Sequence, residues 1–320
     1  MTVEEILARG RPAILIERHL GGLGDLVCMR EAVRSLTERH ADWDLIAHVP
    51  SWYFPLFEDL ATELLPYDAN DLPIMWPQSL DLSAKRRQPL LAFQLFCPCG
   101  IHEEERRFRP TRNRIQNFAD ALGVKPRCPD LRPLLRRWGK RRPRARKRLL
   151  VGMQPWSMNH SKDWPVLRWQ ALVKLLQMAG FARVRVYDAR KRDWRMEGVE
   201  HVKAAGCREL IESVAECDLM IAPDSGCMHV AGALDIPTVA LFGPTDGRLT
   251  CKYYESVRVI EKRRRRKCRQ PCYYNGEHNR YYCERGPEQP RIGDCMLAIE
   301  TVDVYHAVLD TLREERRLAV

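Results

Sequence analysis

The chain has 320 residues, of which 53 are basic and 42 acidic, so its formal net charge is +11. This length predicts about two domains, each able to bury its own core. No apolar run is long enough to cross a bilayer, and residues 1–5 lack the basic start and apolar stretch of a signal peptide, so we expect a cytoplasmic protein rather than a membrane-spanning one.

A strand, a glycine-rich loop and a helix are predicted first. Residues 12–16 form a buried-strand pattern, and apolar residues recur at helical spacing after Leu26. The loop between them contains Gly22 and Gly24, so it can cradle a phosphate or pass close to a sugar, although dinucleotide sites and plain tight packing share this pattern. Asp25 at the first helical turn either complements the helix dipole at the surface or, facing a cleft, serves as a general base.

The rest of the first half continues the alternation of strands and helices. Residues 45–49 and 90–96 have strand patterns, and Gly123 ends a predicted helix. The segment 51–88 contains several prolines, and we expect it to be irregular.

A basic run with interspersed prolines at residues 132–148 indicates an interdomain linker. We therefore expect an N-terminal domain at residues 1–145 and a C-terminal domain at residues 146–320. Strands and helices alternate on both sides of this run, which is typical of α/β domains.

The C-terminal domain is predicted to begin with a strand that leads into a polar loop. The apolar run at 148–155 is followed by Ser161 and Lys162, and then by a helix that ends at Gly180. A lysine here would aim its ammonium group at the strand ends and could neutralise a phosphate. The alternative is a solvated loop lysine.

The most informative stretch predicts a strand, a tight loop, a helix and a second strand. Asp224, Ser225, Gly226 and His229 gather where its first strand ends, and open α/β sheets bind ligands at such ends. Gly226 lets a ligand approach the backbone, and the helix start favours a phosphate, so the arrangement suits a nucleotide diphosphate. The alternatives are ordinary helix capping and a hydrogen-bonded core histidine. Thr245 ends the next strand and either adds a hydroxyl to the pocket or belongs to a turn.

Four late cysteines lie in a segment, residues 262–296, that has little apolar content to fold it. Cys268, Cys272, Cys283 and Cys295 are separated by three, ten and eleven residues. A metal bound by four thiolates would supply the missing stabilisation, although the paired Cys-x-x-Cys of a strong zinc signature is absent. Disulfides are less expected in a reducing cytoplasm.

The surplus of positive charge is concentrated in two runs, residues 132–148 and 262–267. Most such runs are simply solvated. A basic rim also suits an anionic acceptor, or peripheral contact with an anionic membrane surface such as that of the inner membrane.

Three motifs, in this order and at these separations, resemble glycosyltransferase family 9, the heptosyltransferases that extend lipopolysaccharide or modify proteins. They are Gly24-Asp25, Lys162-Asp163-Trp164-Pro165, and Asp224-Ser225-Gly226 with His229. The resemblance implies an α/β fold of GT-B architecture, with two Rossmann-like domains facing across a cleft. The late cysteines would form a small insertion near the C-terminus, and the final helix, at residues 302–312, would cross back to the first domain.

The resemblance also implies an inverting transfer without a catalytic metal, and it implies roles for individual residues. Asp25 matches the base that takes a proton from the acceptor hydroxyl, and Lys162 matches the lysine that stabilises the departing diphosphate. Donor binding would fall to Gly22, Gly24, Ser161, Asp224, Ser225, Gly226, His229 and Thr245.

By resemblance, the donor is ADP-heptose and the acceptor is a lipopolysaccharide core sugar or a protein hydroxyl. Some protein-modifying members of the family carry a cysteine-bound iron in a comparable late finger. We therefore expect either zinc or iron, in a structural role, at the four cysteines.

Three alternatives remain at this stage. A nucleic-acid-binding or scaffold protein would use the basic run and the cysteines, but it leaves Asp25, Lys162 and Asp224 without a role. A glucosyltransferase of the glycogen-synthase type has a similar glycine loop to residues 21–25. A protein that binds a sugar nucleotide but has lost catalysis would share the donor motif only.

Overall fold

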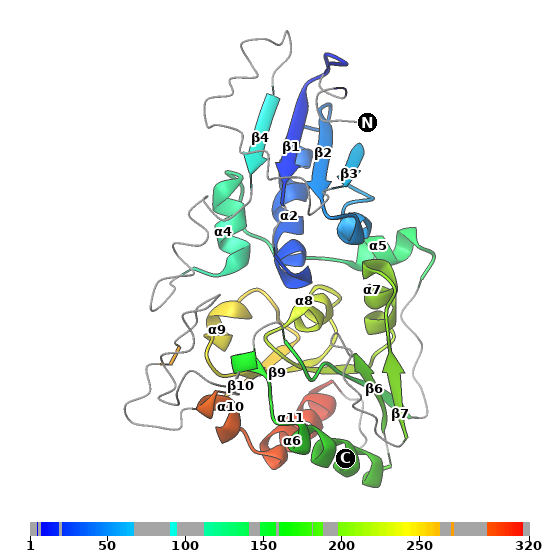
Figure 1. Ribbon diagram of the computed structural model, residues 1–320, viewed down its shortest axis with the longest axis vertical. Coiled ribbons are helices and arrows are strands. Elements are labelled where there is room, and N and C mark those ends of the chain that lie inside the picture. The colour runs from blue at the N-terminus through cyan, green and yellow to red at the C-terminus, as the bar shows by residue number, and fades with distance from the viewer. Residues whose placement is uncertain are drawn as a thin grey trace.

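The computed structural model describes residues 5, 8–18, 21–66, 90–94, 112–140, 148–157, 160–180, 182–187, 198–262, 270–271 and 293–315, with the backbone alone at 90–94. Its elements form two parallel sheets, one above the other in Figure 1, each accompanied by helices.

The first sheet has four parallel strands in the order β3-β2-β1-β4. The strands are β1 (Ala13–Glu17), β2 (Asp44–Val49), β3 (Glu63–Pro66) and β4 (Leu90–Gln94). β1 is central because its whole length is buried, with Ala13 opposite Asp44 on one side and Leu90 on the other. The strands expected near 12–16, 45–49 and 90–96 are thereby confirmed.

The expectation of irregular structure after residue 51 is wrong for the part that the structure describes. A 3₁₀ helix, η1 (Ser51–Leu56), buries Leu56, and β3 then pairs with β2. Both elements are too short to leave a periodic pattern, so they were not visible in the sequence. Residues 67–88 lie outside the described residues.

Three helices accompany the first sheet: α2 (Leu23–Arg39), α4 (Arg114–Ala121) and α5 (Arg132–Arg137). α5 corrects the prediction of a linker over 132–148, because Leu134 and Leu135 are buried and Pro133 suits a first helical turn. Residues 141–147 lie outside the described residues, and so does the expected domain boundary at 145/146.

The second sheet has six parallel strands in the order β10-β9-β8-β5-β6-β7. They are β5 (Leu149–Met153), β6 (Ala182–Tyr187), β7 (Val199–Val202), β8 (Leu219–Pro223), β9 (Thr238–Phe242) and β10 (Val257–Glu261). The central strands β5, β8 and β9 are fully buried apolar runs. The edge strands β7 and β10 carry charged residues, so their sequences did not predict strands.

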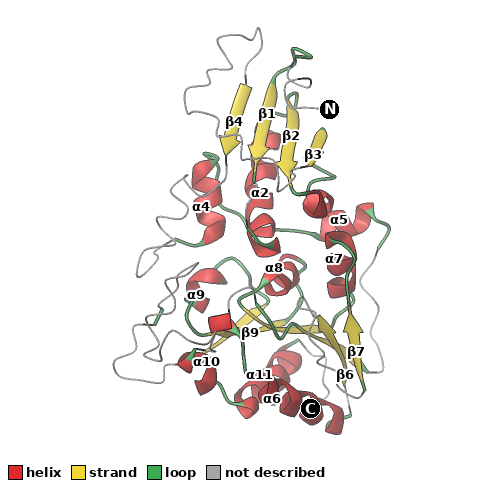
Figure 2. Ribbon diagram, viewed as in Figure 1, coloured by secondary structure: helices red, strands yellow, loops and turns green. Residues whose placement is uncertain are grey.

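Helices cover both faces of this second sheet (Figure 2). They are η2 (His160–Lys162), α6 (Val166–Met178), α7 (Cys207–Ala215), α8 (Gly226–Ala233), α9 (Gly247–Thr250), α10 (Asp294–Ala298) and α11 (Thr301–Glu314). Trp164 and Trp169 pack edge to face with ring centroids 4.9 Å apart, and Trp164 Nε1 donates to the Ile299 carbonyl at 2.9 Å. The tryptophan of the second motif therefore anchors the core rather than the site.

The final helix does not cross back to the first sheet. α11 packs on α6 and on β9 and β10, burying Val304, Val308 and Leu312 against the tryptophan cluster. The expectation of a crossing helix is therefore wrong for residues 301–314, because the apolar face of α11 is satisfied by the second sheet.

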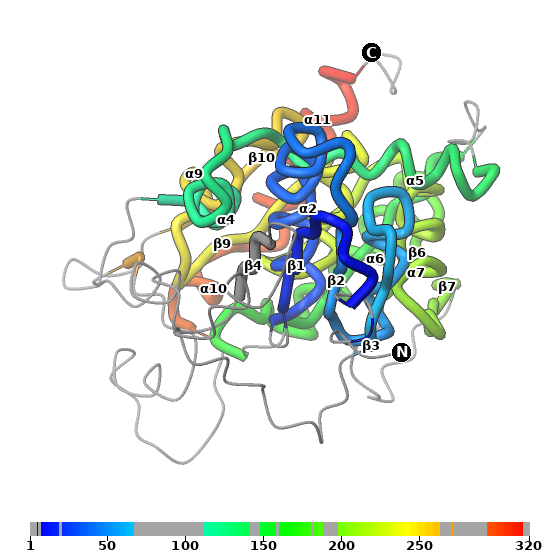
Figure 3. The backbone as a smooth tube through the Cα atoms, turned by 90° about the horizontal axis from the view of Figure 1, so that it is seen from above, coloured from blue at the N-terminus to red at the C-terminus, as the bar shows by residue number. Residues whose placement is uncertain are grey.

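The two halves meet through helices. α2 lies against α8, η1 lies against α7, and one hydrophobic cluster continues from β1 and α2 into α7 and α8. Seen from above, the first half overlies the second (Figure 3). The carboxyl ends of the first sheet point towards the second half (Figure 1), so loops that follow β1 can meet loops that follow β8.

Candidate functional site at the junction of the two sheets

Strand order reverses at one point in each sheet, and the predicted site residues follow those points. In the first sheet the reversal lies between β1 and β4, and in the second between β5 and β8. Ligands of open α/β sheets bind outside the carboxyl ends of strands at such switch points. Asp25 lies on the helix after β1, Lys162 follows β5, and Asp224 follows β8.

Asp25 is buried at the start of α2, where both of its carboxylate oxygens have partners. Oδ1 accepts a hydrogen bond from Arg114 of α4, and Oδ2 accepts one from the Gly22 N–H at 2.9 Å. Arg18 lies 3.7 Å from Oδ2. Burial raises the pKa of Asp25, but Arg114, Arg18 and the Gly22 N–H together lower it by more. The pKa of Asp25 therefore lies below its ordinary value, and the group is ionised at neutral pH.

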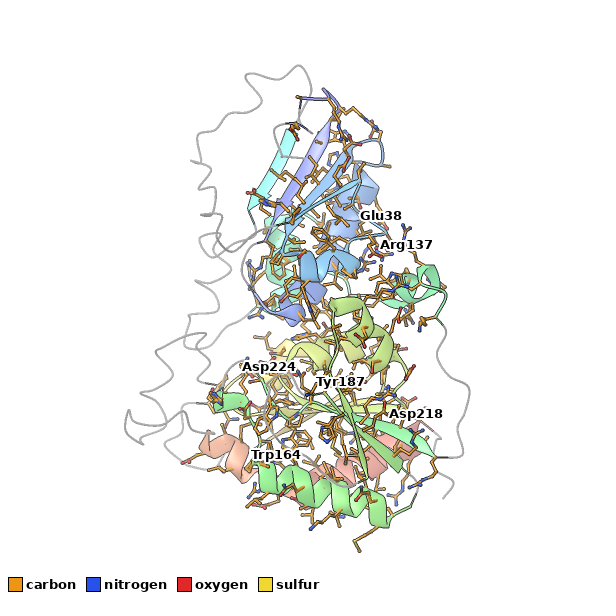
Figure 4. All side chains as sticks on the ribbon, turned by 45° about the vertical axis from the view of Figure 1, so that its right-hand side comes forward. Glu38, Arg137, Trp164, Tyr187, Asp218 and Asp224 are labelled. Atoms are coloured by element: carbon orange, nitrogen blue, oxygen red, sulfur yellow. The ribbon has the colours of Figure 1, made fainter. Side chains whose placement is uncertain are left out.

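Asp224 is held between two cationic side chains. Lys162 Nζ donates to Oδ2 at 2.8 Å, and His229 Nε2 lies 3.7 Å from Oδ1. Burial raises the pKa of Asp224, but Lys162 and His229 lower it well below the ordinary carboxyl value. Figure 4 places Asp224 at the side of the second half that faces the first. The cluster of two cations and one carboxylate carries a net positive charge when His229 is protonated.

His229 is buried near the contact between α8 and α2. Its Nδ1 lies 3.1 Å from the Tyr254 hydroxyl and 3.4 Å from Cys28 Sγ. Burial lowers the pKa of His229, but Cys28 and Asp224 raise it more, to about 10. The hydrogen-bonded interior histidine considered as an alternative is therefore what the structure shows, but at the edge of a pocket rather than deep in a core.

Ser225 and Gly226 serve the protein framework in this structure. Ser225 Oγ donates to Gln154 Oε1 at 2.6 Å, and the Cys227 N–H donates to the same oxygen at 3.1 Å. A Cβ on Gly226 would lie 3.1 Å from Leu23 Cβ, so this glycine allows α8 to approach α2. Gln154, a polar residue immediately after β5, holds this loop, although the sequence analysis gave it no role.

Gly24 is also a packing residue, whereas Gly22 is not crowded. A Cβ on Gly24 would lie 2.6 Å from His229 Cδ2, far closer than real contacts allow, while a Cβ on Gly22 would meet nothing within 4 Å. The glycine loop thus lets the backbone of α2 touch the imidazole of the second half. Gly24 of α2 makes room for His229 of α8, and Gly226 of α8 makes room for Leu23 of α2.

A pocket that is partly open to solvent lies between α4 and α9. From the second half it is lined by Asp224, His229, Thr245, Asp246, Leu249 and Thr250, and from the first by Arg112, Asn113, Arg114 and Asn117. Asn113 Nδ2 donates across it to the Thr250 carbonyl at 3.5 Å. Thr245 Oγ1 is buried and has no hydrogen-bond partner among the described residues, so it is available to a ligand.

Of the residues that the sequence predicted for donor binding, Asp224, His229 and Thr245 line this pocket. Asp25 is connected to the pocket through Arg114, and Lys162 through Asp224. Ser161 lies on η2, and its carbonyl accepts from the Gly293 N–H at 3.3 Å, so its backbone joins α10. The α4 residues were missed, although the cap Asn113 between two arginines was a visible signal.

The predicted metal ligands lie mostly outside the described residues: Cys268, Cys272 and Cys283 do so. Cys295 is buried on α10, where its Sγ would crowd a Cβ on Gly243 at 2.7 Å. In the part of the chain that the structure describes, no cluster of three or more His, Cys, Asp or Glu side chains suits a metal ion. The four-cysteine site stays a prediction.

No helix within the described ranges is both long enough and apolar enough to span a membrane.

Comparison with known proteins points to one family. Residues 129–277 match the model described as Glycosyltransferase family 9 (heptosyltransferase). Lipopolysaccharide heptosyltransferase 2 of Salmonella typhimurium is 32% identical over 127 residues, 36% of this chain and 36% of that protein. Lipopolysaccharide heptosyltransferase 1 of Pseudomonas aeruginosa is 30% identical over 106 residues, 30% of this chain and 29% of that protein. The matched stretch spans about a third of the length of these relatives.

Solved structures extend the likeness over nearly the whole chain. The ADP-heptose lipopolysaccharide heptosyltransferase II of Escherichia coli gives a TM-score of 0.64 at 16% identity, covering 95% of this chain and 99% of that one. The iron-containing dodecameric glycosyltransferase TibC of enterotoxigenic E. coli gives 0.67 at 18% identity, covering 95% and 77%. These likenesses concern the fold. The expected α/β fold of GT-B architecture and the resemblance to family 9 are confirmed.

The two glycines of the loop provide a matched pair of tests. Gly24→Ala should lower the free energy of unfolding by about 1–3 kcal/mol, because the new methyl group overlaps the His229 ring. Alanine is otherwise favoured over glycine inside a helix by about 1 kcal/mol, so a loss would report this overlap. Gly22→Ala, at an open position, should change stability by no more than about 0.5 kcal/mol. Urea unfolding of both variants measures the difference, and equal midpoints would contradict a tight α2–α8 contact.

Proposed function

We propose that this chain, whose residues 129–277 match glycosyltransferase family 9, is an inverting glycosyltransferase that moves heptose from ADP-heptose to a hydroxyl of the lipopolysaccharide core. The first half, taken as residues 1–145, would bind the acceptor, and the second half, residues 146–320, would bind the donor. The names of the curated relatives support heptose transfer to lipopolysaccharide. One solved relative is described in complex with ADP-D-β-D-heptose, which supports the donor.

The observation that carries the proposal is the arrangement of opposite charges around one pocket. Arg114, which is bonded to Asp25, lines it from the first half, while Asp224 lines it from the second and is bonded to Lys162. Inversion requires the attacking oxygen and the departing diphosphate on opposite faces of the sugar. A base carried by the first half and a cationic cluster carried by the second half would meet that requirement.

The second half would hold the departing nucleotide. Asp224 keeps the Lys162 ammonium and the His229 ring at the carboxyl end of β8, and the net positive charge of this cluster favours a diphosphate. α8 begins at Gly226, so the positive end of its dipole lies at the same place. In the transition state the bond from the anomeric carbon to the phosphate oxygen breaks, and Lys162 stabilises the charge that develops on that oxygen.

Asp25 would supply the base. Its carboxylate accepts the proton of the acceptor hydroxyl while that oxygen attacks the anomeric carbon, and ADP departs with the electron pair of the broken bond. A carboxylate has about four lone-pair positions, so the bonds from Arg114 and Gly22 leave room for one more donor. The lowered pKa keeps Asp25 ionised and ready to accept.

The proposal also includes a structural metal ion, the acceptor and contact with the membrane. The cysteines at 268, 272, 283 and 295 would hold a structural zinc or iron ion, and the site itself would use no catalytic metal. The acceptor could equally be a protein hydroxyl, and the basic runs would favour an anionic acceptor or peripheral contact with the inner membrane from the cytoplasm.

Asp25→Asn should separate catalysis from donor binding. The variant keeps the size of the side chain but cannot accept the proton, so kcat should fall by roughly a hundredfold or more. The affinity for ADP-heptose, measured by calorimetry, should change by less than about threefold. Asp44→Asn, at a buried carboxylate on the far end of β2, serves as the control. Full turnover by the Asp25 variant would remove this residue from the mechanism.

Arg114→Gln should move the acidic limb of the rate profile. Because Arg114 lowers the pKa of Asp25 in the wild type, its loss should raise that pKa, and the fall of kcat/KM in acid should begin at a higher pH. Arg112→Gln is the matched control, because Arg112 lines the same pocket but pairs with Asp120. Identical acidic limbs in all three proteins would argue against Asp25 as the titrating base.

A further inference from the structure

Two side chains around His229 have no role in the motifs or in the proposed chemistry. Cys28 of α2 is buried with its Sγ 3.4 Å from His229 Nδ1. Tyr254, between α9 and β10, is buried with its hydroxyl 3.1 Å from the same nitrogen and 3.7 Å from Cys28 Sγ. The three polar atoms form a closed triangle at the place where the two halves of the chain meet.

Both neighbours are held firmly by their own surroundings. A Cβ on Gly232 of α8 would lie 2.6 Å from Tyr254 Cδ1, so the tyrosine ring packs directly on the helix backbone. The same ring meets His229 at an interplanar angle of 63° with centroids 5.7 Å apart. Cys28 lies three residues after Asp25, nearly one turn along the same helix. Both side chains are therefore packed in buried surroundings next to His229.

A partner at one ring nitrogen determines what the other nitrogen can do. An imidazole can turn by half a rotation about its Cβ–Cγ bond, which exchanges nitrogen and carbon positions. A hydrogen bond at Nδ1 fixes both the orientation and the proton on each nitrogen. In this structure that orientation brings Nε2 to 3.7 Å from Asp224 Oδ1. A ring turned the other way would present a carbon to the carboxylate.

We propose that Cys28 and Tyr254 are positioning residues that hold His229 against Asp224. Helix α2 of the first half then helps to shape the diphosphate site of the second half. The identity of the ligand rests on the proposed function. The orientation and protonation of His229 belong to the protein alone. One helix would then carry both the base Asp25 and a support for the leaving-group site.

The surroundings of the ring favour its charged form. Burial lowers the pKa of His229, but Cys28 and Asp224 raise it further, to about 10. Burial raises the pKa of Tyr254 well above its ordinary value, so its hydroxyl keeps its proton and can accept from Nδ1–H while donating to sulfur. The titratable or charged groups near the ring are Asp25 and Cys28 from α2, Arg114 from α4 beyond Asp25, Asp224 before α8, Lys162 from η2, and Cys251 and Tyr254 after α9.

The first part of the test follows His229 by nuclear magnetic resonance in protein labelled with ¹⁵N-histidine. The chain has 9 histidines, and a His229→Gln variant assigns the signals of this one. In wild type the ring should stay doubly protonated at about pH 8. In Cys28→Ala and Tyr254→Phe, and most of all in the double variant, its pKa should fall from about 10 towards the ordinary imidazole value of about 6.5, so that the ring of the double variant is largely uncharged at about pH 8. Cys28→Ser should restore the titration only in part, because its hydroxyl keeps a polar partner at Nδ1 but cannot supply the negative charge of a thiolate.

The second part measures ADP affinity by calorimetry at two pH values. The double variant should bind ADP about tenfold more weakly than wild type at about pH 8 and should recover at about pH 6, where the ring is charged again. A merely structural loss would be equal at both values. Cys217→Ala is the matched control, because Cys217 is a buried thiol 3.3 Å from the Tyr187 hydroxyl, remote from the site.

Two results would overturn the inference: an unchanged His229 titration in the double variant, or ADP affinity that is equally weakened at both pH values. Failure of the wild type to bind ADP would instead overturn the proposed function. In that case the histidine titration still decides whether Cys28 and Tyr254 position the ring.

Discussion

The carboxylate of Asp224, largely withdrawn from water, joins three segments of the second half of the chain. An ionised carboxylate out of water is costly unless it is paired and hydrogen-bonded. Lys162, at 2.8 Å, and His229, at 3.7 Å, supply that pairing from η2 and α8. The pairing fixes the end of β8, the loop after β5 and the start of α8 relative to one another. If a diphosphate binds here as proposed, its charged partners are already held in place by the protein before it arrives.

The contact between α2 and α8 connects that cluster to the first half. Gly24 allows the backbone of α2 to reach the His229 ring, and Gly226 allows α8 to reach Leu23. Asp25 therefore lies on a helix that touches the second half beside His229. Under the proposed function, this packing would set the separation between the base and the departing diphosphate. Arg114 and Asn113 of α4 close the same pocket from the other side.

The sequence predicted the strands that are buried on both faces of the sheets. It also predicted candidate site residues where polar side chains follow these buried strands. β1, β5, β8 and β9 are continuous apolar runs, and Asp25, Lys162 and Asp224 could be placed from them. What could not be predicted depends on contacts between distant segments. The role of Gly24 depends on His229, and Gln154, Cys28 and Tyr254 act only through partners far along the chain. The edge strands β7 and β10 and the helix α5 carry charged residues among their apolar ones, so they do not stand out as buried runs.

The most direct test of the account is a double-mutant cycle on ADP affinity with Lys162→Met, Asp224→Asn and the double variant, measured by calorimetry. If Asp224 acts by holding Lys162 towards the diphosphate, each single variant should bind ADP about tenfold or more weakly. The double variant should lose less than the sum of the two free-energy changes, with a coupling of at least about 0.5 kcal/mol. Wild-type affinity in Lys162→Met, or strictly additive losses, would contradict the claim that this part-buried ion pair forms the diphosphate site.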